Sequence, residues 1–225
     1  SCRELCELQA LQLHRSLLEL SIAFNNLRSL DALPRSCPCL TRLNASHNRL
    51  SALPAEALPA LTRLDVSHNQ LVRLCGISGS SSLRELWVSH NLLDLAALSE
   101  LGRLDKLSIV VLCHNPCEQV RPTGLARALA MLFAPQLTSL DARPVDSTER
   151  ADAARVLEQQ GARQVLSEQL GSKTAHQSLR RLCMLEAKGG RHGRGRGIDT
   201  GRGGGGRGRA GRDTATPLAL SSRRP

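Results

Sequence analysis

The sequence predicts an α/β solenoid: a right-handed arc of short repeats whose parallel strands line its concave side, with a helical C-terminal cap and a disordered tail. Three observations predict this fold class. An apolar pattern recurs five times between residues 17 and 117, a helix-forming segment follows the last copy, and arginine and glycine dominate from residue 189 onward. A fixed period of roughly 20 to 50 residues is typical of solenoids, because each unit buries its apolar side only against its neighbours.

The repeats are clearest at 40–50, 61–71 and 83–93, which read LTRLNASHNRL, LTRLDVSHNQL and LRELWVSHNLL and fit the pattern LxxLxLxxNxL. Degenerate copies occupy 17–27 and 107–117. One asparagine marks each copy, with spacings of 23, 21, 22 and 24 residues: Asn25, Asn48, Asn69, Asn91 and Asn115. Chance does not place five copies in register, so the pattern defines the fold.

Each LxL portion predicts a short strand whose alternate side chains point inward and stack into one core. The inward pairs of the three clearest repeats are Leu43 and Ala45, Leu64 and Val66, and Leu86 and Val88. We expect the marker asparagines to form a ladder of hydrogen bonds to the backbone of their own and the neighbouring coil, since each buried unpaired group costs about 1 to 3 kcal/mol. The convex returns hold several prolines and suit single helical or 3₁₀ turns.

The two ends of the solenoid need caps, because a terminal repeat leaves core exposed. Before the first strand stands the convex half of an earlier repeat. After the last repeat, Pro122 to Ala134 reads as a helix, followed by PQLTSLDARPVDSTER at 135–150. The expected divisions are a truncated repeat at 1–16, repeats at 17–118, a cap at 119–150, a loosely attached helical extension at 151–187 broken at Gly161 and Gly171, and a disordered tail at 188–225.

HNPC at 114–117, the helix after it and PQLTSLDxxxVxxxER together resemble the terminal cap of the 22-residue class of leucine-rich-repeat proteins. That class includes the leucine-rich regulatory subunit of protein phosphatase 1, the light chain of outer-arm axonemal dynein and a spliceosomal A-prime protein. The resemblance covers about 17–150 and is strongest over 83–146, where relatives often carry a tryptophan at the position of Trp87. It implies a protein partner, either a dynein heavy chain or another microtubule-associated protein, or alternatively a phosphatase.

Residues beside each inward leucine are expected on the concave side, where such a partner would bind. The candidate partner-binding residues are Arg42, Asn44, Arg63, Asp65, Glu85, Trp87, Ile109 and Val111. Trp87, with Ile109 and Val111 beside it, has the character of an interface anchor. The alternative is that Trp87 only packs on its neighbours. The charged residues could likewise contact a partner or pair with one another across adjacent strands.

Histidines precede four of the marker asparagines, at His47, His68, His90 and His114, and would lie roughly 5 Å apart along the solenoid. Spacing of this kind does not by itself predict a metal site, and we expect neither a metal nor a cofactor. Cys37 takes an apolar position that leucine fills in other repeats, so it is expected in the core. No strained nucleophile turn or phosphate loop is present, and the chain is predicted not to be an enzyme.

The formal net charge of +10 is concentrated in the tail, which holds nine arginines and two aspartates within 189–225. This low-complexity composition predicts disorder. Its arginines could bind RNA without sequence specificity or be methylated, or the tail could be compositional only. The candidate arginines are Arg194, Arg196, Arg202, Arg207 and Arg209. No apolar run is long enough to span a membrane. The sequence therefore predicts a monomeric, non-enzymatic interaction scaffold, cytoplasmic and associated with the cilium, flagellum or cytoskeleton. The alternatives are a phosphatase regulatory subunit and an RNA-associated protein.

Overall fold

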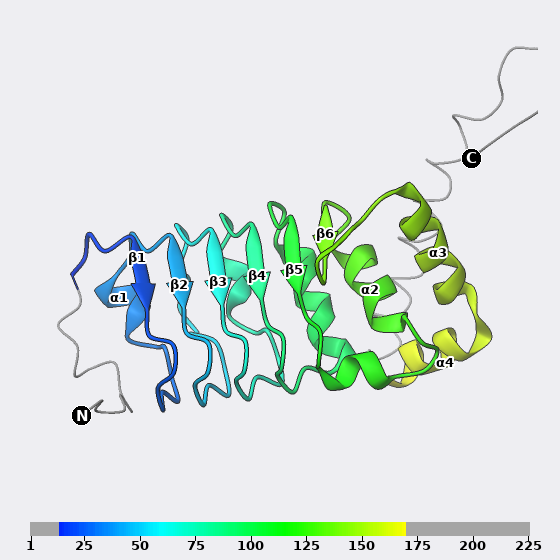
Figure 1. The fold of residues 1–225 in the computed structure, drawn as a ribbon, viewed down its shortest axis with the longest axis horizontal. Coiled ribbons are helices and arrows are strands. Elements are labelled where there is room, and N and C mark those ends of the chain that lie inside the picture. The colour runs from blue at the N-terminus through cyan, green and yellow to red at the C-terminus, as the bar shows by residue number, and fades with distance from the viewer. Residues whose placement is uncertain (1–13, 170–225) are drawn as a thin grey trace, which may run out of the picture. The chain divides into compact units, whose positions relative to one another are not determined.

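The computed structural model describes residues 14–169, which form a capped solenoid (Figure 1). The segments 1–13 and 170–225 lie outside the described residues, and with them most of the truncated N-terminal repeat, the end of the helical extension and the whole tail. The five candidate tail arginines therefore have no described position: Arg194, Arg196, Arg202, Arg207 and Arg209.

One sheet of seven short strands runs through the described chain in sequence order. The five repeats supply β1 (Glu19–Ser21), β2 (Arg42–Asn44), β3 (Arg63–Asp65), β4 (Glu85–Trp87) and β5 (Ile109–Val111), all parallel to one another. The cap then adds β6 (Ser139–Leu140) in parallel and β7 (Arg143–Pro144) antiparallel to β6. In Figure 1 the strands stand side by side from the blue N-terminal end to the green cap. This is the α/β solenoid that the sequence predicts.

The inward side chains of the strands form the core, as the repeat pattern requires. Leu43, Leu64 and Leu86 are aligned by the strand register, and each is at least 96% buried. Ala45, Val66 and Val88 are buried just after each strand. Because every coil contributes the same apolar positions, one continuous core extends from Ile22 to the cap.

Four marker asparagines, Asn48, Asn69, Asn91 and Asn115, hydrogen-bond both their own coil and the preceding one. Asn69 shows the pattern: its Oδ1 accepts the backbone N–H of Leu50 at 2.9 Å, and its Nδ2 lies within 3.1 Å of the carbonyl oxygens of Ala45, Val66 and Ser67. Asn48, Asn91 and Asn115 accept the corresponding N–H of the preceding coil. Asn25 donates to the carbonyls of Ile22 and Ala23 in its own coil. The ladder satisfies polar groups that the apolar core leaves without water.

Short helices form the returns on the side opposite the sheet. They are α1 (Leu33–Ser36) and the 3₁₀ helices η2 (Ile77–Gly79), η3 (Leu95–Arg103) and η4 (Pro116–Gln119). The return before η2 packs closely on the preceding coil: a Cβ added to Gly76, whose φ is +94°, would lie 2.3 Å from the carbonyl oxygen of Pro54. Cys37 and Cys117 are fully buried, consistent with apolar positions in the core.

The cap is larger and more tightly packed than the sequence analysis expects. It consists of α2 (Leu125–Phe133), α3 (Ser147–Glu158) and α4 (Gln160–Gln169). The extension from residue 151 was expected to be loosely attached with a break at Gly161. Instead its helices break at Gln159, and four of its side chains are buried in the core: Ala153, Leu157, Ala162 and Leu166. Each helix has its own i, i+4 apolar pair, and the break changes the register between the two pairs.

Asp141, between β6 and β7, closes the last coil. Its Oδ1 accepts the backbone N–H groups of Leu112 at 2.7 Å and of Cys113 at 3.0 Å. Arg127 on α2 donates to the Leu140 carbonyl at 2.7 Å and pairs with Glu149 on α3 at 2.5 Å. At the cap, side chains therefore bond backbone groups at the end of the sheet that have no further strand to pair with. Within residues 14–169, none of the helices has the length and apolar run needed to cross a bilayer.

Candidate functional site: the outward face of the sheet

The outward side chains of β1–β5 form two rows across the strands, and we call this surface the sheet face. The first row is Glu19, Arg42, Arg63, Glu85 and Ile109, and the second is Ser21, Asn44, Asp65, Trp87 and Val111. All eight predicted partner-binding residues lie in these rows, so the repeat register brings them together on one surface. Because the strands are parallel and in register, residues of a row are lateral neighbours.

Charged groups in the first row of the sheet face pair with each other. Arg42 Nη1 lies 2.9 Å from Glu19 Oε1, and both side chains are 62% exposed. Arg63 Nη1 lies 3.5 Å from Glu85 Oε2. The sequence allows these charged residues either to contact a partner or to pair with one another across adjacent strands. In the structure, these four residues form ion pairs across adjacent strands. Exposed pairs of this kind contribute under about 1 kcal/mol each.

Asp65 and Asn44 act on their own turns. The Oδ1 atom of Asp65 accepts the backbone N–H of Ser67, and that of Asn44 accepts the backbone N–H and the hydroxyl of Ser46. Both are side-chain turns of a kind common after strands. Within the described residues, Asp65 forms no ion pair. Its carboxylate is therefore a charged group on the sheet face that is not neutralised by a neighbouring cationic side chain.

Trp87 lies half-buried at the centre of the C-terminal half. The guanidinium carbon of Arg63 lies 4.3 Å from the centroid of its ring, a cation–π contact. The indole Nε1 is buried and has no hydrogen-bond partner among the described residues. Trp87 therefore packs on a neighbour, as one alternative held, while the ring also remains partly open on the sheet face.

Ile109 and Val111 adjoin Trp87 on the next strand, in the register pairs Glu85 with Ile109 and Trp87 with Val111. Both side chains are half-buried. With Trp87 they form a group of three apolar side chains on the sheet face, which we call the apolar half. Such a group can lose water to an apolar surface of another molecule, and it has no acid, base or nucleophile positioned for chemistry.

The turns that follow β1–β5 carry a column of rings along one edge of the sheet. Phe24, His47, His68, His90 and His114 stack with centroid distances of 4.2, 4.0, 4.1 and 4.2 Å. The repeat register predicts the histidine column but not the stacking of its rings. The available signal was the ring residue directly before each marker asparagine, which is part of Ser-His-Asn at 46–48, 67–69 and 89–91. All five ring residues have the same left-handed backbone conformation, with φ between 52° and 60°.

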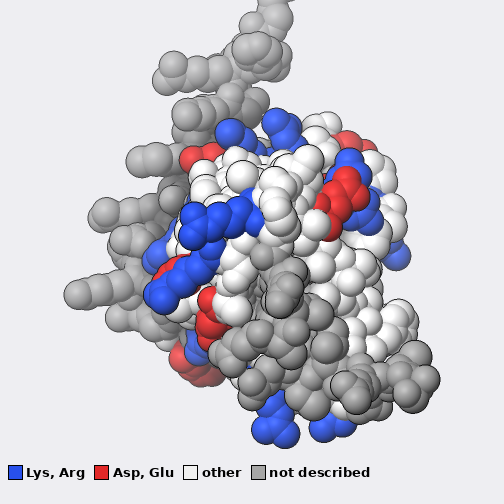
Figure 2. Space-filling model, turned by 90° about the vertical axis from the view of Figure 1, so that its left-hand side faces the viewer, with Lys and Arg blue, Asp and Glu red and all other residues white. Residues whose placement is uncertain are grey.

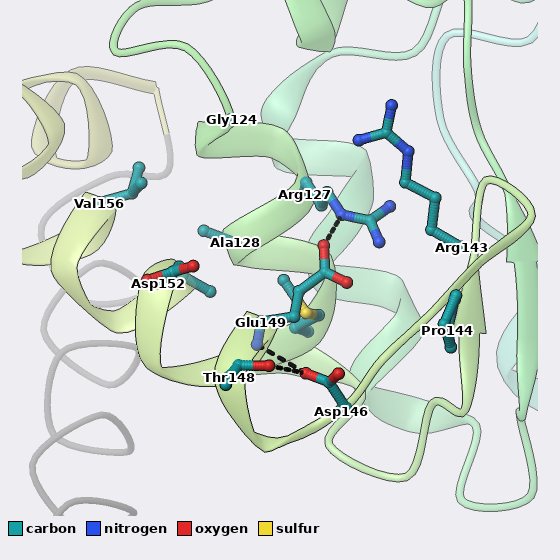
Figure 3. Close-up of a pocket in the computed structure, with 12 residues that line it drawn as sticks. Gly124, Arg127, Ala128, Arg143, Pro144, Asp146, Thr148, Glu149, Asp152 and Val156 are labelled. Carbon is teal, nitrogen blue, oxygen red and sulfur yellow. Dashed lines mark hydrogen bonds and ion pairs between the residues drawn. The ribbon is translucent and has the colours of Figure 1, made fainter. Parts of the chain in front are cut away.

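A cavity of about 470 Å³ lies in the cap, between α2, β7 and α3. Figure 3 shows Arg127 pointing toward Glu149 across it, with Arg143 at one side and Asp146 below. Arg127 lowers the pKa of the Glu149 carboxyl by donating a hydrogen bond to it. Asp146 caps α3 by accepting the backbone N–H of Glu149 at 2.8 Å. Arg127, Glu149 and Asp146 thus hold the elements of the cap together, while Nη2 of Arg127 is buried without a hydrogen-bond partner among the described residues.

Neither the cavity nor the sheet face gathers metal ligands: within residues 14–169, no three His, Cys, Asp or Glu side chains are placed to hold a metal ion. In the end-on view of Figure 2, acidic and basic side chains lie close to each other on a mostly uncharged surface. The sheet face, with its apolar half, is therefore the candidate site.

Solved structures share this architecture. The chain is similar to a chain of the Drosophila melanogaster SNF/U2A′ complex, with a TM-score of 0.59 and 24% identity over 67% of this chain and 87% of that one. It is similar to an internalin from Listeria monocytogenes with a TM-score of 0.45 and 23% identity, and to the leucine-rich repeat domain of APL1B with 0.39 and 27%. This chain spans 36% and 38% of the latter two. Neither a protein-family model nor a curated protein matches it.

The chain has a leucine-rich-repeat fold. The similarity to the Drosophila chain extends over most of that chain's length, and the five strands, the asparagine ladder and the in-register leucines give the fold its physical basis. Identities at this level show the architecture only. The specific likeness to the phosphatase subunit and the dynein light chain remains a prediction from residues 83–146.

Proposed function

We propose that this leucine-rich-repeat chain is a non-enzymatic scaffold or regulatory subunit that binds a protein partner on its sheet face. The observation that carries the proposal is the apolar half: Trp87, Ile109 and Val111 lie together on two adjacent strands, on the outward side of the sheet, where the fold has no need of apolar side chains. Aromatic residues surrounded by apolar neighbours are typical centres of protein interfaces.

Energetics favour this half over the charged one. Burial of apolar surface contributes roughly 25 cal/mol per Å², and a tryptophan anchor with its neighbours can contribute on the order of 2 kcal/mol or more. The pairs Arg42–Glu19 and Arg63–Glu85 are already made within the free protein. Breaking them to contact a partner would gain little. We therefore propose that the apolar half sets the affinity for the partner. The orientation of the partner is set by the polar and charged residues of the two rows: Arg42, Asn44, Arg63, Asp65 and Glu85.

The resemblance over residues 83–146 gives the first partner classes to test. They are a dynein heavy chain or another microtubule-associated protein, which would place the chain in the cytoplasm at the cilium, flagellum or cytoskeleton, and a protein phosphatase. An RNA bound through the arginine-rich tail is the alternative from another class, and it would require the tail rather than the sheet face.

An affinity pull-down with the full chain separates these alternatives. Four baits are compared: the wild type, Trp87→Ala, Arg42→Ala as a matched change in the charged half, and a chain lacking the tail at 188–225. The proposal expects specific protein partners to be retained by Arg42→Ala and by the truncated chain, and lost with Trp87→Ala. If every partner instead disappears with the tail, the sheet face is not the binding site. Circular dichroism of each bait provides the control for folding.

A further inference from the structure

The stacked rings are the most regular feature of the molecule that neither the core nor the sheet face explains. One ring per repeat contributes to the column, in the order Phe24, His47, His68, His90 and His114. Interplanar angles of 10° to 17° make the rings nearly parallel. The three inner imidazoles therefore have a ring against both of their faces, while their residues are exposed at the surface.

The fold holds these rings in place. Each ring residue has a positive φ, and the asparagine that follows each of the four histidines is buried and hydrogen-bonded to two coils, as at Asn48 and Asn69. The backbone N–H of His47 donates to the carbonyl of Ser67 in the next coil, and that of His68 to Ser89. Because adjacent coils are fixed at the strand spacing of about 4.8 Å, the backbones of neighbouring ring residues stay close together, and the imidazoles separate only if their side chains rotate out of the column or the turns move.

Few opposite charges are available to neutralise protons on the column. Asp65, at the end of β3, favours the charged form of His68, and Glu118 on η4 accepts the backbone N–H of His114 at 2.7 Å. Arg49, two residues after His47, is exposed and adds a positive charge to that turn. Two imidazolium ions with centroids about 4 Å apart repel each other, and the repulsion is larger where neighbouring rings exclude water. A column of four positive rings is consequently unfavourable.

We propose that the four stacked imidazoles form a proton-sensitive seam, which is stacked when neutral and which loosens the turns after β2–β5 when more than one ring is protonated. This is a regulatory property of the fold, and it is independent of the proposed function on the sheet face. The ligand is the proton itself, and the acidic range of intracellular compartments is sufficient to supply it.

The sign of the effect follows from His68. Partial loss of hydration lowers its pKa below the ordinary histidine value, and the neighbouring His47 and His90 lower it further. The unfolded chain, with an ordinary histidine pKa of about 6.5, then binds protons at a higher pH than the folded chain. The stability contributed by the neutral stack is therefore fully present above about pH 6.5 and is lost as the pH falls through the lower folded pKa.

Phe24 supplies the variant that tests the seam. It occupies the same turn position with φ of 58° and stacks on His47 at 4.2 Å, so phenylalanine is compatible with the column. The double variant H68F/H90F keeps the rings and removes two titrating groups from the centre. His14→Phe is the matched control, because His14 lies outside the column and its ring nitrogen bonds Ser16.

The measurement is the Tm of the full chain at about pH 7.5 and about pH 5.5. We expect the wild type and His14→Phe to lose at least about 3 °C more on acidification than H68F/H90F. Equal losses in all three proteins would overturn the proposal. If the double variant does not fold, NMR titration of His68 in the wild type decides: a midpoint below the ordinary histidine value of about 6.5 supports the seam, and a midpoint at or above that value contradicts it.

Discussion

Strands β1–β3 and strands β4–β5 present outward side chains from identical register positions, yet the two halves differ in what those side chains already contact. In the first half, Glu19 and Arg42 pair with each other, and Asn44 bonds its own turn. In the second half, Ile109 and Val111 have no polar function, and Trp87 is covered only in part, by Arg63. In the first half, the polar side chains are thus already paired within the protein. In the second half, the apolar side chains would gain free energy if a partner buried them.

Introducing a charge at the end of the second row has the largest expected effect. Val111→Asp places a carboxylate in the centre of the proposed contact, where a partner would bury it without a counterion. Binding should weaken by about 100-fold, or on the order of 3 kcal/mol. Ser21→Asp puts the same group at the same row position on β1 and should change the Kd less than about threefold. Isothermal titration calorimetry with the captured partner measures both, and equal losses would remove the distinction between the halves.

The second half also depends on the cap for its stability. Asp141→Ala leaves the backbone N–H groups of Leu112 and Cys113 without their acceptor, next to β5. We expect a loss of about 2 kcal/mol in the free energy of unfolding and a Tm lower by roughly 4 to 8 °C. Asn44→Ala also removes an oxygen that accepts a backbone N–H, but it leaves one such group without its acceptor and not two, and it should cost less. Urea denaturation of the two variants checks the order, and a reversed order would contradict it.

Arg63 links the halves, since it pairs with Glu85 and stacks on Trp87. Arg63→Ala removes both contacts, with an expected cost of about 1 kcal/mol in stability. Trp87 is the only tryptophan in the chain, so its fluorescence reports on this contact directly. Emission should shift to longer wavelength as the ring gains water. Arg84→Ala, at an exposed neighbouring position, is the control, and an unchanged spectrum in Arg63→Ala would show that the two side chains do not stack in solution.

The smallest effect is expected from Arg42→Ala. Its ion pair with Glu19 is 62% exposed on both sides, so the free energy of unfolding should change by less than about 1 kcal/mol, and the change should diminish at high salt. Thermal denaturation at about 0.05 M and 0.5 M NaCl measures both quantities. A loss larger than that of Asp141→Ala would mean that the charged half stabilises the fold more than its contacts suggest.

The sequence predicts positions correctly where residues of the same kind make the same contact in every repeat. The LxL positions and the marker asparagines are each read five times, so Leu64, Leu86 and Asn69 could be placed before the structure was known. Where a residue has two plausible partners, the sequence did not choose: Arg63 and Glu85 could face a partner or each other, and only side-chain positions decide.

Features that depend on local geometry were beyond the sequence pattern. The ring column requires the positive φ of His47 and its equivalents, which brings rings expected roughly 5 Å apart to within 4.0 to 4.2 Å. The packing of α3 and α4 was missed because a break at Gln159 shifts the apolar positions of one helix against the other. The spacing of apolar residues is regular within each helix. It appears irregular when both helices are treated as one continuous helix.

The binding role of the apolar half is best measured by titrating Trp87→Ala and Arg42→Ala, each in the full chain, against the captured partner. We expect Trp87→Ala to weaken binding by about 30-fold, or about 2 kcal/mol, and Arg42→Ala to weaken it by less than about fivefold. Equal affinities for the two variants, with both folded, would contradict the assignment of the binding energy to the apolar half.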